Sequence, residues 1–248
     1  MNTRMYSAAM RRTLRGAFVG VAAFVAALAV PSASRAETIN TTLDTLIAGG
    51  NNQAGIVLGD KRYSNFTFSS SGDAPIPVNA VDVALSTTDN NQYNLRFSFQ
   101  RQALAAAGGQ TTDAVICYQI DVIGSQQING VGLVFDSAVA GGSPGLAAAS
   151  VTETISRVAP LGTDVGLITV FNDGTGGLPD NTSTTLAVNP TASTLYFCKD
   201  ILVSSRPEGG RVSISTVDNF VTQTPEPGSI ALLAVGAGAL LIRRRRGA

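Results

Sequence analysis

Apolar and polar residues alternate with a period of two through most of residues 37–224. In Gln92–Gln100, for example, Asn94, Arg96 and Ser98 alternate with aromatic residues and a leucine. Ten such runs are separated by Gly, Asn or Pro: Gly55–Gly59, Arg62–Phe68, Ala80–Ser86, Gln92–Gln100, Val115–Ile123, Gly130–Asp136, Ser150–Val158, Val165–Phe171, Thr194–Val203 and Arg211–Val217. This pattern predicts β-strands with one buried face. We therefore expect one all-β domain over residues 37–224, an antiparallel β-sandwich of the jelly-roll or immunoglobulin-like kind.

Three segments of the domain depart from the alternation. Thr41–Ala48 places its apolar residues on one helical face and is followed by Gly49 and Gly50, which predicts a short helix. We expect this helix to plug one end of the sandwich. The small-residue stretches Gln102–Gly109 and Ala138–Ala149 are expected to be loops.

The N-terminal end has the pattern of an export signal. Four arginines precede the apolar run Ala17–Val30, namely Arg4, Arg11, Arg12 and Arg15. Pro31 ends the run, and small residues lead to Ala36. This combination is typical of a signal peptide, here residues 1–36, that is exported by the general secretion machinery and cut by signal peptidase between Ala36 and Glu37. An uncleaved anchor is disfavoured by the small residues at the expected cleavage site.

The C-terminal end contains a second apolar run between two distinctive motifs. Ile230–Ile242 has thirteen residues without charge, so as a helix it covers about 20 Å of a hydrocarbon core of about 30 Å. Pro225, Glu226 and Pro227 precede it, and Arg243, Arg244, Arg245 and Arg246 follow it. Arginines favour the cytoplasmic side of the inner membrane, which places the prolines on the far side. We expect a short transmembrane helix.

This tail resembles the PEP-CTERM sorting signal, which also carries the label ice-binding protein C-terminal domain. The resemblance covers residues 225–248. It implies recognition by an exosortase, a membrane-embedded cysteine transpeptidase or protease, in a bacterium that makes exopolysaccharide. The chain is then expected to be held briefly in the inner membrane and afterwards released or transferred to the cell surface. The alternative is an ordinary tail anchor, which the short helix and the Pro-Glu-Pro motif disfavour.

Removal of both ends changes the net charge of the protein. The whole chain has 17 basic and 17 acidic residues, but residues 37–224 keep 8 basic and 16 acidic ones, a net charge of −8. An acidic protein lacks the basic surface that nucleic acid requires, so nucleic acid is not an expected partner.

The composition also excludes several kinds of chemistry. The chain contains no histidine, which removes Ser-His-Asp catalysis and histidine-ligated metals. The domain has three glutamates, Glu37, Glu153 and Glu208, and no tryptophan to stack on sugars. A carboxylate pair for glycoside hydrolysis stays open, because aspartates are present. We nevertheless expect no catalytic residues, no cofactor and no metal site.

Cys117 and Cys198 are the only cysteines, and both lie in predicted strands after the export signal. Disulfides form in oxidising compartments outside the cytoplasm, so we expect these two residues to be bonded. Two buried free thiols are the alternative. The bond requires Cα atoms less than about 7 Å apart.

Glu153 and Lys199 interrupt the apolar phase of their strands. Glu153 shares its strand face with Val151 and Ile155, and Lys199 shares its face with Phe197. A lone buried charge is costly, and these two charges have opposite sign, so we expect a pair inside the sandwich or at its edge. If a β-bulge shifts the phase of these strands, both charges instead face water and do not interact. The sequence leaves both arrangements open.

Two function classes fit these observations. The first is a structural or interaction protein of the cell surface or the exopolysaccharide matrix, with exopolysaccharide as a partner. The second is a non-catalytic binding module for carbohydrate or ice. Exposed aromatic residues on a concave sheet face would favour carbohydrate, but most aromatic residues here fall in the inward phase. Thr152 and Thr154 are too few for the flat threonine array that ice binding needs.

Overall fold

The computed structural model describes residues 37–48, 54–88, 92–99, 104–140, 145–173 and 181–224. The signal peptide, the residue Ala36 at its expected cleavage site, the Pro-Glu-Pro motif, the C-terminal apolar run and the arginine cluster lie outside the described residues. Among the described residues, no helix has the length and apolar character to cross a membrane.

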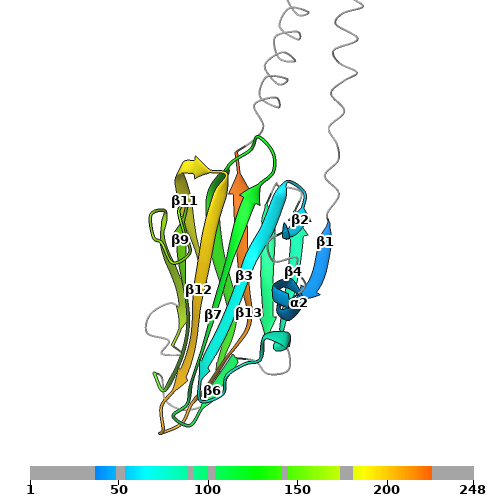
Figure 1. Cartoon of the computed structure of the whole chain (residues 1–248). Helices are drawn as coiled ribbons and strands as arrows, with labels where there is room; N and C mark the ends of the chain where they lie inside the picture. The colour runs from blue at the N-terminus through cyan, green and yellow to red at the C-terminus, as the bar shows by residue number, and fades with distance from the viewer. Residues whose placement is uncertain are drawn as a thin grey trace, which may run out of the picture. The chain divides into compact units, whose positions relative to one another are not determined.

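The described residues form two antiparallel sheets, as the alternation predicts (Figure 1). The seven-stranded sheet has the order β1 (Thr38–Thr42), β4 (Val81–Thr87), β5 (Tyr93–Phe99), β13 (Arg211–Gln223), β8 (Ile128–Ala140) and β11 (Ser183–Ala192), and β6 (Leu104–Ala107) also pairs with β13. The six-stranded sheet has the order β10 (Gly166–Asn172), β9 (Ala147–Ser156), β12 (Thr194–Ser205), β7 (Thr111–Val122), β3 (Lys61–Gly72) and β2 (Ile56–Leu58). In Figure 1, β12, β7 and β3 lie side by side in front of β13. The fold is therefore a β-sandwich.

Aromatic rings from both sheets fill the space between them. Tyr118 of β7 stacks between Phe66 and Phe197, with ring centroids 5.7 and 5.1 Å away. Phe97 of the opposite sheet lies 5.8 Å from the same ring. All four side chains are buried. Burial of such large apolar surfaces is the main favourable term in folding, so these rings mark the centre of the core.

The helix α2 (Leu43–Ala48) closes one side of the sandwich, where it contacts β1, β3, β4 and the 3₁₀ helix η1 (Val78–Ala80) (Figure 1). Leu43 and Leu46 are buried in the core, so the helix exists as predicted but covers a side of the sandwich and not the expected end. The helix begins two residues later than expected, because Thr41 and Thr42 belong to β1 and pair with β4.

The expected loops are wrong in part. Leu104–Ala107 forms β6, and both ends of the second small-residue stretch belong to β8 and β9. Alanine and serine have weak β propensity, but tertiary context overrides such preferences. Here the neighbouring strands β13 and β12 supply the hydrogen-bonding partners.

Candidate functional site

A polar groove of about 510 Å³ crosses the outer face of the seven-stranded sheet. Its lining comes from β1, β4, β5, β13 and β8, and its main side chains are Ser86, Gln92, Asn94, Arg96, Asp218 and Phe220. The register explains why they gather. Ser86, Asn94 and Phe220 occupy one row across three strands, and Arg96 and Asp218 are paired in the next row. The apolar residues between them point into the core, so these side chains point outward.

The floor of this polar groove contains an aromatic ring laid over a glycine. Phe220 is paired with Gly132 on the neighbouring strand β8. A Cβ atom on Gly132 would lie 1.9 Å from Cζ of Phe220, and 2.3 and 2.4 Å from its two Cε atoms. These nearly equal distances place a face of the ring, and not its edge, above Gly132. The side chain is half-buried, so the opposite face is available to a ligand.

An ion pair borders the ring. Arg96 donates two hydrogen bonds to the carboxylate of Asp218, from Nε at 2.6 Å and from a terminal nitrogen at 3.1 Å. Hydrogen bonding and the negative charge of Asp218 raise the pKa of Arg96. This paired geometry fixes both side chains, and it leaves other guanidinium protons free to bind hydroxyl groups.

Amide side chains complete the polar groove. Gln92 donates a hydrogen bond of 3.1 Å from Nε2 to Oδ1 of Asn94. This bond occupies one amide oxygen and one amide hydrogen, which leaves the other donors and acceptors facing the groove. A half-buried aromatic face between fixed charges and amides is suited to a ligand with apolar faces and many hydroxyl groups.

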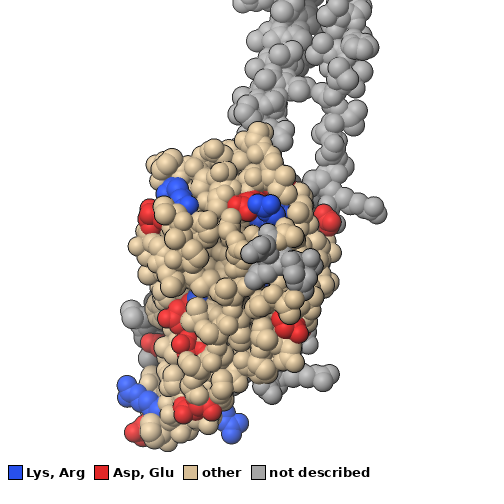
Figure 2. All heavy atoms as spheres, in the orientation of Figure 1, with Lys and Arg blue, Asp and Glu red and all other residues tan. Residues whose placement is uncertain are grey.

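The cysteines predicted to pair are joined by a disulfide. Cys117 of β7 and Cys198 of β12 occupy directly opposed positions, and their Cα atoms are 4.1 Å apart. They lie on the outer face of the six-stranded sheet, away from the polar groove. Figure 2 shows this face with scattered charged side chains. The described residues contain no free cysteine, so the two-thiol alternative does not hold in this structure.

Glu153 and Lys199 form the pair predicted from the sequence. They are directly opposed on β9 and β12, and both side chains are fully buried. Lys199 Nζ donates to Glu153 Oε1. The register between the two strands is continuous, so no bulge separates the charges. Burial lowers the pKa of Lys199, and the charge of Glu153 opposes this shift.

Two further side chains complete a core polar cluster of Glu153, Lys199, Asn219 and Tyr118. Asn219 of β13 donates from Nδ2 to Glu153 Oε2 at 2.8 Å and to the backbone oxygen of Gly132 at 3.2 Å. Tyr118 donates from its hydroxyl group to Asn219 Oδ1 at 2.8 Å. The cluster therefore links the two sheets through the middle of the core. Burial raises the pKa of Tyr118 well above its usual value.

Lys61 forms a second buried site that the sequence analysis missed. The turn between β2 and β3 lies at Gly59 and Asp60, so Lys61 is the first residue of β3, although the expected strand began at Arg62. Its side chain is fully buried, donates to Asp60 at 2.6 Å and to Gln223, and lies 4.3 Å from the centre of the Tyr93 ring. Burial lowers the pKa of Lys61. One signal was available: Lys61 and Lys199 are the only lysines in the chain.

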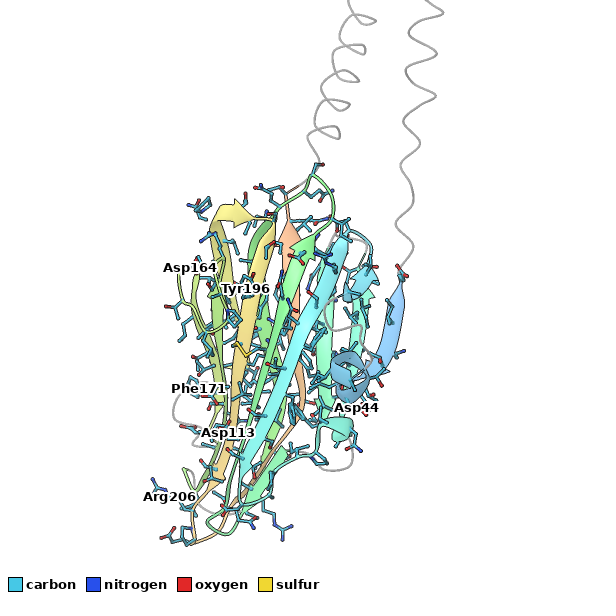
Figure 3. All side chains as sticks on the ribbon, in the orientation of Figure 1. Asp44, Asp113, Asp164, Phe171, Tyr196 and Arg206 are labelled. Carbon is cyan, nitrogen blue, oxygen red and sulfur yellow. A yellow bond between two sulfur atoms is a disulfide. The ribbon has the colours of Figure 1, made fainter. Side chains whose placement is uncertain are left out.

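Metal-binding groups do not gather in the part of the chain that the structure describes, where no group of three or more Asp, Glu, Cys or His side chains could hold an ion. Two carboxylates do approach each other on the outer face of the six-stranded sheet, those of Asp113, which is labelled in Figure 3, and Asp200. Burial, together with a hydrogen bond and the charge of Asp200, raises the pKa of Asp113.

The family comparison matches the tail of the chain. Residues 223–246 match the model of the PEP-CTERM protein-sorting motif. The chain therefore carries this sorting motif, as the sequence resemblance indicates, and the motif implies export. No curated protein matches the sequence.

The solved structures that match this chain are remote in sequence and have low TM-scores. The carbohydrate-binding module TmCBM61, in complex with β-1,4-galactotriose, is 13% identical over 61% of this chain and 86% of that one, with a TM-score of 0.26. The low-affinity xylan-binding module CBM86 of Roseburia intestinalis is 14% identical over 67% and 97%, with a TM-score of 0.24. The rhamnosidase of Klebsiella oxytoca with bound rhamnose is 14% identical over 75% and 33%, with a TM-score of 0.26.

Proposed function

We propose that this exported protein is a non-catalytic module of the cell surface or extracellular matrix, and that its polar groove binds one strand of exopolysaccharide. The observation that carries the proposal is the Phe220 ring, which lies over Gly132 with its other face directed into the groove. An aromatic ring in this position offers a flat apolar surface to one face of a sugar ring.

The side chains around Phe220 supply the polar half of the recognition. Asn94 and Gln92 present amide donors and acceptors on one side, and the Arg96–Asp218 pair presents a fixed charged group on the other. Sugar hydroxyl groups both donate and accept hydrogen bonds, so amides and charged pairs match them well. The groove crosses several strands and thus suits a chain of sugars better than a small compact ligand.

The sorting tail fits a function at this location. In this proposal signal peptidase removes residues 1–36, exosortase acts at the Pro-Glu-Pro motif, and the domain reaches the cell surface. The excess of acidic residues keeps the domain soluble in a hydrated matrix. The domain would then act there as an adhesive or structural component.

The absence of catalysis is part of the proposal. Hydrolysis of a glycosidic bond normally needs two carboxyl groups, one of which donates a proton. Among the described residues that line the groove, Asp218 supplies the only carboxylate. Both of its oxygens accept hydrogen bonds from Arg96, so this carboxylate is already engaged in an ion pair.

Binding of the processed protein to the extracellular polysaccharide of the producing bacterium tests the proposal. Removal of the ring in Phe220→Ala should weaken binding about tenfold or more, because an aromatic side chain contributes about 1.5–3 kcal/mol when it is buried. Tyr196→Ala is the matched control, because Tyr196 is a half-buried tyrosine on β12 of the other sheet (Figure 3). Equal binding by wild type and Phe220→Ala would refute the assignment of the groove.

A further inference from the structure

The core polar cluster brings a primary amine, a carboxylate and a carboxamide together inside the sandwich. Lys199 and Glu153 are fully buried, and Asn219 has 1% of its surface exposed. The three residues come from β12, β9 and β13, and the amide belongs to the opposite sheet from the other two. An ion pair that only fixed the register of β9 and β12 would not need this third group.

Glu153 connects the amine to the amide. Its Oε1 accepts a hydrogen bond from Lys199 Nζ, and its Oε2 accepts one of 2.8 Å from Asn219 Nδ2. Each oxygen of this carboxylate therefore accepts a hydrogen bond from one of the two nitrogens. A carboxylate placed in this way can take a proton from one nitrogen and give a proton to the other, which is the role of a general acid and base.

The amide is oriented and polarised for attack on its carbon. Its nitrogen faces two acceptors, Glu153 Oε2 and the backbone oxygen of Gly132, so its oxygen must face Tyr118. The hydroxyl group of Tyr118 donates to that oxygen at 2.8 Å. A donor fixed at this position stabilises the negative charge that develops on a carbonyl oxygen when a nucleophile adds to its carbon.

The surroundings make the amine easier to deprotonate. The Tyr118 ring centre lies 5.3 Å from Lys199 Nζ, and Phe197, two residues before Lys199 on β12, stacks on the same ring. Burial in this apolar environment lowers the pKa of Lys199. A desolvated lysine loses its proton more readily and then becomes a nucleophile. Transfer of the proton to Glu153 would give the neutral amine next to the amide.

We propose that Lys199 and Asn219 form an intramolecular isopeptide bond, with Glu153 as the proton carrier and Tyr118 as the oxyanion donor. The lone pair of Nζ attacks Cγ of Asn219, and the carbonyl electrons move to Oδ1. Glu153 delivers its proton to Nδ2, the Cγ–Nδ2 bond breaks, and ammonia leaves. Nζ gives up its further proton to Glu153 as the carbonyl re-forms, and Glu153 passes this proton to the departing ammonia, which leaves as ammonium. The lysine ammonium and the carboxamide thus become a secondary amide and an ammonium ion, without oxidation or reduction and without a co-reactant.

Such a bond would join the two sheets covalently at the strand that leads to the sorting tail. β13 ends at Gln223, the residue at which the match to the sorting motif begins. A link from Asn219 to Lys199 would carry a force applied at this end into β12, at the centre of the six-stranded sheet. The disulfide joins β12 to β7 within that same sheet, so the two links would be complementary.

Peptide mapping of the processed full-length protein tests the proposal. After reduction of the disulfide and denaturation, trypsin should not cleave after Lys199, because the enzyme requires a free lysine side chain. The peptide that contains Lys199 should remain joined to the peptide that begins at Val212. The pair should be lighter than the sum of its two parts by one ammonia molecule, and fragment ions should place the link at Asn219.

Variants test the roles within the core polar cluster. Asn219→Ala and Glu153→Gln should abolish the link, and the disulfide reports whether each variant has folded. Tyr118→Phe should still form the link, but about a hundredfold more slowly, as expected for loss of an oxyanion donor. Wild-type protein with an intact disulfide but normal cleavage after Lys199 would overturn the proposal. Lys61 is the second buried amine, and it donates hydrogen bonds to Asp60 and to the amide oxygen of Gln223. A covalent link at Lys61 or Gln223 in place of the one at Lys199 and Asn219 would also overturn the proposal.

Discussion

Cys117 lies directly opposite Cys198 on neighbouring strands, with their Cα atoms 4.1 Å apart, although 81 positions separate them in the sequence. A disulfide at this place closes a long loop in the unfolded chain while it adds little constraint to two strands that are already paired. In the chain-entropy account, its stabilisation therefore comes mainly from the unfolded state.

We predict that Cys117→Ser/Cys198→Ser loses about 4 kcal/mol of unfolding free energy, the value expected for a loop of this length. Denaturant unfolding measures the loss. Wild-type protein kept reduced should unfold at the same denaturant concentration as the double variant. An equal midpoint for oxidised and reduced wild type would mean that the bond does not stabilise the domain.

The sequence predicted the strands with clear alternation and missed those without it. β5 and β7 have apolar residues at every second position, and a single buried face explains both. β1 has the sequence TINTT and lies at an edge of its sheet. It is held by pairing with β4, and no pattern within its own five residues reports that contact. Pairing between distant strands is a tertiary property, so the local pattern cannot contain it.

The two candidate sites differ in how far the sequence could reveal them. Glu153 and Lys199 were found because each interrupts an apolar phase that continues on both sides. Asn219 and Phe220 were missed because a register shift between Ile214 and Thr216 changes the phase of β13. The shift turns Asn219 inward and Phe220 outward. A bulge adds one residue to a strand, so it reverses the faces of all residues that follow it.

We predict that Gly132→Ala weakens polysaccharide binding without removing any group that contacts the ligand. The new methyl group would lie 1.9 Å from Cζ of Phe220, so the ring must leave its position above β8. Isothermal titration calorimetry with the exopolysaccharide should show a loss similar to that of Phe220→Ala. Gly124→Ala is the control, because a Cβ atom there meets nothing within 4 Å. Unchanged affinity in Gly132→Ala would show that ring position does not determine binding.

We predict that the mature protein lacks the arginine cluster. The sorting motif covers residues 223–246, and processing at Pro225–Glu226–Pro227 would remove Arg243–Arg246 with the apolar run. Intact-mass analysis of protein from the cell surface should give a species that ends near the motif. Replacement of Pro225 and Pro227 by alanine should leave the full tail on the protein and retain it in the inner membrane. A surface species that keeps all four arginines would support an ordinary tail anchor.

We predict that the charges of Glu153 and Lys199 stabilise each other even when no isopeptide bond can form. A double-mutant cycle with Glu153→Gln and Lys199→Met in an Asn219→Ala background isolates this effect. Each single change leaves one buried charge without its partner and should cost roughly 3–5 kcal/mol. The double change should cost clearly less than the sum of the two. Additive losses of unfolding free energy would show that the two side chains do not interact.

We predict that the neighbouring carboxylates of Asp113 and Asp200 give the domain a pH-dependent stability of opposite sign to that of ion-paired carboxylates, whose folded pKa is lowered. Burial and the neighbouring charge raise the pKa of Asp113 in the folded protein. Between the unfolded pKa of about 3.9 and the raised folded value, the folded state binds more protons than the unfolded state. The contribution of Asp113 to the free energy of unfolding therefore falls as pH rises through that interval, and it stays reduced at higher pH. Asp113→Asn should be more stable than wild type at neutral pH, and the difference should vanish below pH about 3.9.

Urea unfolding of both proteins across this pH range measures the difference. Asp200→Asn is the informative companion, because it removes the charge and hydrogen bond that act on Asp113 but leaves Asp113 itself in place. Asp200→Asn should give part of the increase in stability that Asp113→Asn gives. The difference between the two increases measures the effect of burial on Asp113. If the free energies of unfolding of wild type and Asp113→Asn change in parallel with pH, Asp113 has the same pKa in the folded and unfolded chains. The approach of the two carboxylates would then have no effect on stability.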